Sequence, residues 1–439
     1  MSYISDLENL NYDIIPERKS IGRLGYIQGE GFSPYVDGLI FDGDANFRNL
    51  FQAVRSGGSF DAWADTAREC RKMSTTARIM LSASFDSPLL EPLGALPFFV
   101  HLWGVDSGTG KTVALMLAAS VWGDPAVGAY IKTFDATVVG HEKTAAFLNH
   151  LPLCLDELQL AKDAKGRTQF DVYKLAQGVG KTRGNKAGGV DMTPTWRNCI
   201  LTTGESPLTS TGAGAGAVNR VIDIECRSAE AVITDGMRIA GAFKANYGHA
   251  GKMFVERIYG IDGALETIIE EYRATFKRLS VRDTTEKQAM AAAAILVADK
   301  LATAWFFEDG LQLTDGEIAE FLASKAAVSA GERAYNYLCD WVEMNRFHFF
   351  GSDPDGNVEC WGGSDESYTY IIRAKFNAAL EEAGYSPNAV LSFLRQKNLI
   401  EVSGKGFTKT KRFGGSAPHC VWLKREMVEE INEMCDGFL

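Results

Sequence analysis

The segment from Val105 to Thr112 constrains the fold more than any other part of the chain. It reads Val-Asp-Ser-Gly-Thr-Gly-Lys-Thr and lies between an apolar stretch over 97–103 and a helix-like run over 113–122. A strand, a glycine-rich turn and a helix in this order are typical of a P-loop, whose backbone N–H groups turn towards a phosphate. The segment therefore predicts a parallel α/β sheet that binds a nucleotide.

Individual residues of this loop have separate predicted roles. We expect Lys111 to reach the β- and γ-phosphate oxygens of ATP and the Thr112 hydroxyl to bind Mg²⁺. The glycine usually found five positions before Gly110 is Val105 here, and Gly104 stands one position early. The predicted nucleotide contacts are Asp106, Ser107, Gly108, Thr109, Gly110, Lys111, Thr112 and Val113.

A second nucleotide-binding element is predicted at residues 151–157, Leu-Pro-Leu-Cys-Leu-Asp-Glu. A continuous apolar run is typical of a buried parallel strand, and ligands lie beyond the carboxyl ends of such strands. We expect this Walker B strand to place Asp156 on Mg²⁺ and Glu157 on the attacking water. The alternative is an ordinary strand end, which the preceding P-loop disfavours.

Composition excludes several classes of protein. The chain has 439 residues, enough for two to four domains, and 46% hydrophobic content describes an ordinary globular protein. We identify no run near the roughly 20 apolar residues of a membrane span, and no signal peptide. The eight cysteines form no Cys-x-x-Cys pair, which predicts reduced thiols in a cytoplasmic protein without a zinc site. A net charge of −11 argues against a protein that coats nucleic acid, but it permits a local basic channel.

Four sections can be separated along the chain. They are an N-terminal α+β region (1–75), a nucleotide core (76–256), a helical segment (257–330) and a C-terminal section (331–439). Further core strands are predicted at 198–203 and 218–226. In the last section, helices at 334–345, 370–383 and 387–397 precede β-like segments at 400–402 and 420–423, an order that suggests a winged helix.

A polar strand end follows the Walker B strand at residues 200–205, Ile-Leu-Thr-Thr-Gly-Glu. A polar side chain at this position can orient the attacking water and sense the γ-phosphate. We assign this role to Thr203, with Thr202 as the second choice. The alternative is a strand that ends in an ordinary turn.

Arg220 follows the Gly/Ala-rich segment 212–217 and precedes a predicted strand at 221–224. A guanidinium on such a loop can bridge γ-phosphate oxygens as charge develops, as an arginine finger does. Because such fingers usually complete a neighbouring subunit's site, Arg220 predicts a homo-oligomeric ring, for which we expect a hexamer. A salt bridge at a strand edge is the alternative.

The segment 177–186, Gln-Gly-Val-Gly-Lys-Thr-Arg-Gly-Asn-Lys, places glycines beside basic residues. A cationic loop of this kind suits contact with nucleic-acid phosphates, a role we assign to Lys181, Arg183 and Lys186. Its Gly-Lys-Thr triplet lacks a preceding apolar strand, so it does not predict a second P-loop. A solvated basic loop without a ligand is the alternative.

Several of these motifs together resemble the family of domain of unknown function number 927, found in bacteria, phages and mobile elements. The similarity runs from about residue 22 to 257 and rests on the P-loop helix and on the segments 101–104, 118–123, 155–157, 178–183, 196–197 and 203–205. That family is predicted to contain P-loop ATPases with helicase activity. The resemblance implies a replication or mobility context.

The sequence as a whole predicts an additional-strand, catalytic-glutamate P-loop ATPase related to AAA+ proteins and hexameric helicases. The expected function is a ring-shaped DNA helicase or translocase of phage or mobile-element replication, acting on single-stranded or forked DNA with replication partner proteins. One alternative is a regulatory or defence ATPase that switches a protein partner, and another is a nucleotide-binding module without hydrolysis. The winged helix is expected either to bind DNA or to pack subunits.

Overall fold

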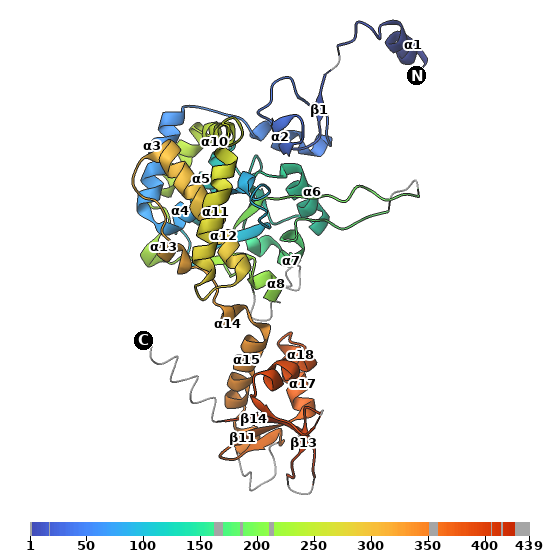
Figure 1. Ribbon diagram of the computed structural model, residues 1–439, viewed down its shortest axis with the longest axis vertical. Coiled ribbons are helices and arrows are strands. Elements are labelled where there is room, and N and C mark those ends of the chain that lie inside the picture. Colours follow the sequence, from blue (N-terminus) through green and yellow to red (C-terminus); the bar gives the residue numbers. More distant parts are fainter. Residues whose placement is uncertain are drawn as a thin grey trace. The chain divides into compact units, whose positions relative to one another are not determined.

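The computed structural model describes residues 2–16, 18–161, 170–184, 188–209, 215–350, 359–404, 406–413 and 416–425. The chain divides into two compact units (Figure 1). The first unit contains residues 1–209 and 219–323, and the second contains residues 210–218 and 324–439. The P-loop and the Walker B strand both belong to the first unit.

A parallel five-stranded sheet forms the centre of the first unit. Its order is β6–β7–β8–β5–β9, and all four neighbouring pairs are parallel. The strands are β5 (Phe98–Trp103), β6 (Lys132–Thr133), β7 (Leu153–Asp156), β8 (Cys199–Gly204) and β9 (Val221–Glu225). Because the strands are parallel, their carboxyl ends form one edge of the sheet, the carboxyl edge, and their starts form the amino edge.

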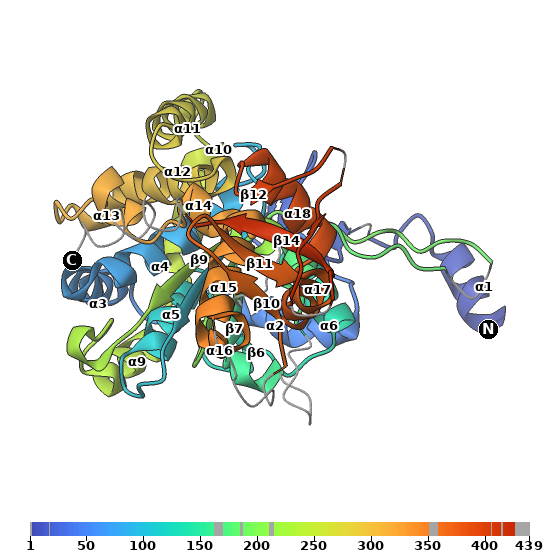
Figure 2. The same cartoon turned by 90° about the horizontal axis from the view of Figure 1, so that it is seen from below.

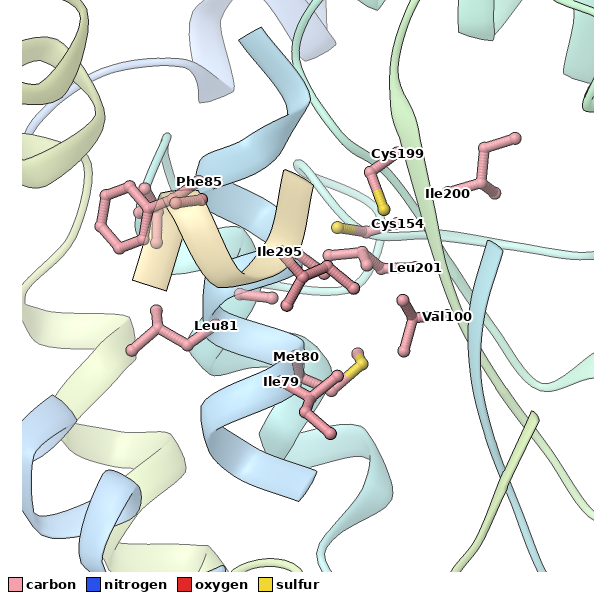
Figure 3. Packing of buried hydrophobic residues seen from close by; sticks show 14 of the residues in the cluster. Ile79, Met80, Leu81, Phe85, Val100, Cys154, Cys199, Ile200, Leu201 and Ile295 are labelled. Atoms are coloured by element: carbon pink, nitrogen blue, oxygen red, sulfur yellow. The ribbon is translucent and has the colours of Figure 1, made fainter. Parts of the chain in front are cut away.

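Two helices, α4 (Thr75–Asp86) and α12 (Glu286–Ala302), pack together, and α4 also contacts β8. Figure 3 shows Met80 of α4 and Ile295 of α12 near Val100 and Leu201, which are paired across β5 and β8. These four side chains belong to one buried apolar cluster. Truncating a buried side chain such as Ile295 to alanine costs about 2–5 kcal/mol, so this layer contributes strongly to stability.

The helix α12 and the π-helical turn after it, Thr303–Phe307, form one apolar stretch. By length and composition this helix could cross a membrane, which the sequence analysis did not identify. In the structure, 72% of its apolar window is buried inside the protein. Its apolar residues therefore serve as core in this fold, against α4 and α11 (Ala264–Ser280), which Figures 1 and 2 both place beside α12.

A buried ion network ties α12 to the helix α3 (Phe60–Met73). Arg71 donates hydrogen bonds to Asp299 at 2.9 Å, to the Thr303 hydroxyl at 2.8 Å and to Asp309 at 2.8 Å. Several partners surround the guanidinium, as a buried charge requires. This network joins the first section expected from the sequence, 1–75, to the third, 257–330.

The rest of the first unit contains short helices and two small sheets. Its other helices are α1 (Ser2–Leu10), α2 (Arg48–Ala53), α5 (Lys111–Ser120), α6 (Val138–Leu148), α7 (Val172–Leu175), α9 (Gly236–Ala245), α10 (His249–Tyr259) and α13 (Asp315–Ala319). The small sheets pair β1 (Ser20–Ile21) with β4 (Ile40–Phe41), and β2 (Gly25–Ile27) with β3 (Gly31–Ser33).

The second unit has its own core and a sheet in the order β10–β11–β14–β12, with β13 paired to β14. Its strands are β10 (Gly362–Ser364), β11 (Tyr368–Ile372), β12 (Ile400–Glu401), β13 (Lys409–Thr410) and β14 (His419–Lys424). Its helices are α8 (Ala215–Val218), α14 (Lys325–Val328), α15 (Ala330–Met344), α16 (Phe347–Phe350), α17 (Arg373–Glu382) and α18 (Pro387–Gln396). The helices α17 and α18 follow each other across a four-residue turn and pack together.

One predicted helix in this unit is wrong at its start. The sequence predicted a helix over 370–383, but Tyr370 to Ile372 belong to β11, and α17 begins at Arg373. Aromatic and β-branched residues favour strands, and β11 is paired on both sides, with β10 and β14. Tertiary pairing therefore ends the helix earlier than local periodicity indicated.

Candidate nucleotide-binding site

The turn between β5 and α5 has a backbone that only glycine fits well. Gly104 and Gly110 have φ angles of 155° and 86°, which glycine adopts without a steric penalty. A Cβ atom on Gly104 would lie 2.3 Å from the Cys226 carbonyl oxygen, and one on Gly110 would lie 2.5 Å from that of Ile233. The segment after β9 therefore packs directly against the loop, whereas the Val105 side chain is 85% exposed.

Three hydrogen bonds hold the loop against the segment that follows β9. The Cys226 N–H donates to the Trp103 carbonyl at 2.7 Å, and the Val232 N–H donates to the Thr109 carbonyl at 2.8 Å. The Ser228 N–H donates to the Asp106 carboxylate at 2.9 Å. Hydrogen bonding by Ser228 lowers the pKa of Asp106. Contacts with the segment after β9 therefore fix the conformation of the P-loop.

Lys111, the first residue of α5, has its ammonium group inside the loop. Its Nζ atom donates to the carbonyl oxygens of Gly104 at 2.9 Å and Asp106 at 2.7 Å. A positive charge is therefore already positioned where the loop turns. Such fixed charges need little reorganisation when an anion binds.

A cluster of polar side chains lies across the carboxyl edge from the loop. The Thr112 hydroxyl donates to Asp156 Oδ1 at 3.3 Å, and the Thr203 hydroxyl donates a hydrogen bond to the same oxygen. Thr203 Oγ1 also accepts the Glu157 backbone N–H at 3.3 Å. Glu157 has a φ of 65°, which is uncommon for a residue with a Cβ and is a type of backbone strain that recurs at active sites.

These elements surround a pocket of about 310 Å³. It is lined by all eight predicted nucleotide contacts, 106–113, together with Asp156, Glu157 and Thr203. Gln159 and Glu205 also line the pocket and received no role in the sequence analysis. Glu205 was visible as the end of the Thr-Gly-Glu segment, whereas Gln159 lies in a 3-10 turn after β7 and no sequence signal distinguishes it.

The two threonines of β8 face opposite sides of the sheet, as successive strand residues do. Thr203 points to Asp156, whereas the Thr202 hydroxyl lies 2.7 Å from His101 Nδ1. His101 Nε2 lies 3.0 Å from the Ser206 carbonyl oxygen, which can only accept, so Nε2 carries the proton. Burial lowers the pKa of His101. Of the two candidates, Thr203 is the one at the pocket.

Arg220 lies away from this pocket. Its carbonyl oxygen accepts the Phe99 N–H at 2.8 Å, which places it at the amino edge of the sheet. Its guanidinium lies over the Tyr173 ring at 5.0 Å, and it lines a small cavity that includes Lys287. Within one chain, the structure therefore separates Arg220 from Lys111.

The basic segment near residue 180 forms an extended ribbon, which we define as residues 179–184 and 188–195. Its two arms pair through bridges between Val179 and Thr195 and between 184 and 190, and both Figures 1 and 2 show the ribbon extending away from the sheet. Lys181 is exposed on this ribbon. Lys186 lies outside the described residues.

Arg183 has a partner within the chain. It forms a 2.6 Å ion pair with Glu142 of α6, whose side chain is only 5% exposed. Removing one partner of a buried pair leaves the other charge uncompensated, which is destabilising. Arg183 therefore helps to hold the ribbon against α6, in addition to the contact with nucleic acid expected from the sequence.

Comparisons with known proteins identify two parts of the chain. A family model described as domain of unknown function (DUF927) matches residues 21–196, and one described as the Cch helix turn helix domain matches residues 329–424. A solved structure described as SCCmec type IV Cch, an active helicase, aligns with a TM-score of 0.72 and 18% sequence identity. The alignment covers 98% of this chain and 84% of that chain. No curated protein matches this chain.

These matches confirm the family resemblance and the α/β fold with a parallel five-stranded sheet. At 18% identity the structural likeness concerns the fold. Residues 21–196 therefore belong to the DUF927 family, and residues 329–424 form a Cch helix-turn-helix domain.

Proposed function

We propose that this chain is an ATP- and Mg²⁺-dependent motor on nucleic acid, a DNA helicase or translocase that acts in the replication of a phage or mobile element. The observation that carries the proposal is the convergence of Lys111, Asp156, Glu157 and Thr203 on one pocket. Each of these side chains has the chemistry needed for one part of phosphoryl transfer. The likeness to a structure described as an active helicase supports the choice of motor.

The proposed chemistry divides among these residues. Lys111 stabilises charge on the terminal phosphates, and Glu157 accepts a proton from the attacking water. Thr203 positions the Asp156 carboxylate and the backbone of Glu157, because its hydroxyl contacts both. The order β7–β8–β5 supports the additional-strand, catalytic-glutamate class, because β8 lies between the P-loop strand and the Walker B strand.

The donor set fits Mg²⁺. The hydroxyl of Thr112 and the buried carboxylate of Asp156 are oxygen donors that lie close together at the pocket. Mg²⁺ in phosphoryl-transfer sites commonly takes one or two protein oxygens and completes its shell with phosphate and water. The ion supplies charge neutralisation for the phosphates, and these two residues would hold it.

The proposed partner is single-stranded or forked DNA. The ribbon offers Lys181 as an exposed cation, and the helix-turn-helix domain, which we interpret as a winged helix, supports contact with duplex DNA. A homohexameric ring in the cytoplasm, with replication proteins as partners, completes the proposal. We propose a ring because of Arg220, whose position at the amino edge suits a contact with another subunit's nucleotide.

Two substitutions test the nucleotide site. Lys111→Ala should abolish ATP binding or turnover, whereas Glu157→Gln should bind ATP and hydrolyse it hardly at all, because one residue holds phosphate and the other activates water. ATP affinity and steady-state phosphate release should be measured with and without single-stranded DNA. Wild-type turnover of Glu157→Gln would overturn the Walker B assignment. Wild-type hydrolysis that DNA does not stimulate would favour a regulatory or defence ATPase.

A further inference from the structure

A second cavity lies at the amino edge of the sheet, at the opposite end of β7 and β8 from the nucleotide pocket. Its volume is about 590 Å³, larger than the nucleotide pocket. The charged and aromatic residues that line it are Arg23, Tyr26, Glu91, His150 and Arg197. None of these residues has a role in the proposed hydrolysis of ATP.

Hydrogen bonds hold the walls of this cavity together. The hairpin β2–β3 docks on the end of α6 through the Leu24 N–H, which donates to the Phe147 carbonyl at 2.8 Å. The Tyr26 N–H donates to His150 Nδ1 at 2.9 Å, and the Arg197 N–H donates to the Asn149 carbonyl at 3.0 Å. The N-terminal hairpin, the start of β7 and the start of β8 therefore form one preorganised site.

The hydrogen bonds also fix the charge of the cavity. Because His150 Nδ1 accepts the Tyr26 N–H, the proton lies on Nε2, which donates to Glu91. Burial lowers the pKa of His150, so the imidazole is neutral at pH 7. The Glu91 carboxylate thus accepts a hydrogen bond from a neutral His150. Arg23 and Arg197 supply two positive charges to the cavity, against the one negative charge of Glu91.

One of these guanidiniums has an unused donor. Arg197 Nη1 is buried and has no hydrogen-bond partner among the residues that the structure describes. It lies beside Gly178, where a Cβ atom would come within 2.8 Å of it. A buried donor without a partner is destabilising, so the protein does not fully satisfy this guanidinium, and Arg197 also lines the cavity.

Tyr26 adds an aromatic surface to this basic site. Its side chain is 39% exposed, and one side of its ring stacks on Tyr259 with the centroids 5.3 Å apart. The cavity also adjoins the ribbon, because Val179 and Thr195, the paired residues at the root of the ribbon, line it. A basic groove with an aromatic side chain is the arrangement that binds single-stranded nucleic acid without reading its sequence.

We propose that this cavity binds a phosphate group of single-stranded nucleic acid through Arg23 and Arg197, with a base against Tyr26. The strand then continues along the ribbon past Lys181. This site deepens the proposed function, on which its role in a motor rests. The same phosphate chemistry occurs in free nucleotides and inorganic phosphate, so the experiment below includes both.

The test measures binding of labelled oligo(dT) to the full chain over a range of salt concentrations, without ATP. Arg23→Ala and Arg197→Ala should each weaken binding and lower the log–log salt slope by about 0.7, because each removes one phosphate contact. Tyr26→Ala should weaken binding by roughly fivefold or more, equivalent to about 1 kcal/mol, whereas Tyr26→Phe should retain it. Arg48→Ala is the matched control, because it removes an exposed arginine of the same N-terminal region outside the cavity.

Further measurements make the result decisive. Arg197 is partly buried, so melting temperatures should be recorded, and Arg23→Ala tests the proposal independently because Arg23 is exposed. Titrations with inorganic phosphate and ATP distinguish the sources. Loss of phosphate or ATP affinity in the arginine variants, with oligonucleotide binding intact, would overturn the nucleic-acid site. Unchanged salt slopes in both arginine variants would overturn it as well.

A different result would overturn the proposed motor while leaving this binding site intact. In that case the wild-type protein would bind oligonucleotide through these arginines but show no DNA-stimulated hydrolysis.

Discussion

Replacing Arg220 with alanine tests whether catalysis is shared between subunits. Arg220 precedes β9 at the amino edge, and the P-loop begins after Trp103, whose partner on β9 is Glu225. Five residues of strand separate Arg220 from Glu225, a distance of about 16 Å at 3.3 Å per residue. In this structure Arg220 therefore cannot serve the nucleotide of its own chain, and a catalytic role requires a neighbour.

The size of the effect distinguishes the two explanations for Arg220. As an arginine finger it should contribute about 10³-fold or more to turnover, which corresponds to about 4 kcal/mol of activation free energy. As a packing residue over Tyr173, 5.0 Å away, it should contribute about 0.5–2 kcal/mol to the free energy of unfolding. The finger predicts normal ATP affinity with almost no hydrolysis. The packing role predicts a lower melting temperature with turnover largely retained.

Mixing two inactive variants gives the decisive assay. Lys111→Ala spoils its own pocket but still offers Arg220, so mixing it with Arg220→Ala should restore hydrolysis wherever an intact loop meets an intact arginine. Arg227→Ala is a matched control, because Arg227 follows the other end of β9 beside Ser228, which contacts the P-loop. If Arg227→Ala lowers turnover and Arg227 acts within its own chain, mixing that variant with Lys111→Ala should give no more hydrolysis than Arg227→Ala gives alone. Background activity for the Arg220 mixture at every ratio, with subunit exchange confirmed, would refute the shared site.

The remaining predictions concern other side chains. Thr203→Val should lower turnover by roughly tenfold to a hundredfold, because its hydroxyl orients Asp156, whereas Thr202→Val, on the opposite face, should affect turnover much less. Lys181→Ala should lower the salt slope of single-stranded DNA binding by about 0.7, measured by fluorescence anisotropy. Asp86→Asn should raise the melting temperature at pH 7–8, because burial raises the pKa of Asp86 and wild-type stability is lost as pH rises above its unfolded pKa.

Each of these predictions has an outcome that contradicts it. Equal loss of turnover in Thr203→Val and Thr202→Val would show that the hydroxyl facing Asp156 has no special role. For Lys181, the control is Lys72→Ala, which removes an exposed lysine of α3. An equal change of the salt slope in both variants would show that Lys181 of the ribbon makes no specific contact with DNA. The Asp86 difference should shrink as the pH falls and disappear below about pH 3, where the wild-type carboxyl is protonated in both states. A difference that is constant with pH would instead indicate altered packing.

The nucleotide pocket could be predicted because its residues are contiguous or follow strands whose pattern is clear. The P-loop supplies eight of the lining residues from one segment, and Asp156, Glu157 and Thr203 follow from the rule that parallel strands present ligands at their carboxyl ends. The choice of Thr203 over Thr202 depended on which face of β8 each residue occupies. A shift of one residue reverses that face, so the sequence alone ranked the two and the structure places only Thr203 at the pocket.

Other features depend on contacts between distant segments, which local patterns do not contain. The pair between Arg183 and Glu142 joins residues 41 positions apart, and it turns a residue expected only to contact DNA into part of the ribbon's support. The second cavity combines an N-terminal hairpin with the starts of two core strands. Arg23 looks like an ordinary surface residue in sequence, and Arg197 stood out only as part of the segment 196–197 that carries the family resemblance. For the same reason the strand at Tyr370 was predicted as helix, since its pairing partners lie elsewhere in the chain.

The strands β7 and β8 give the two sites a direct physical relation. His150 precedes β7, which ends at Asp156. Arg197 precedes β8, whose last two residues are Thr203 and Gly204. The hydrogen bond between Thr203 and Asp156 joins these strands at the carboxyl edge, and the Arg197–Asn149 backbone hydrogen bond joins the same segments at the amino edge. A shift of β8 relative to β7 would therefore alter both sites together. If such a shift accompanies nucleotide binding, linkage requires that ATP change the affinity for the DNA strand by the same factor as the strand changes the affinity for ATP.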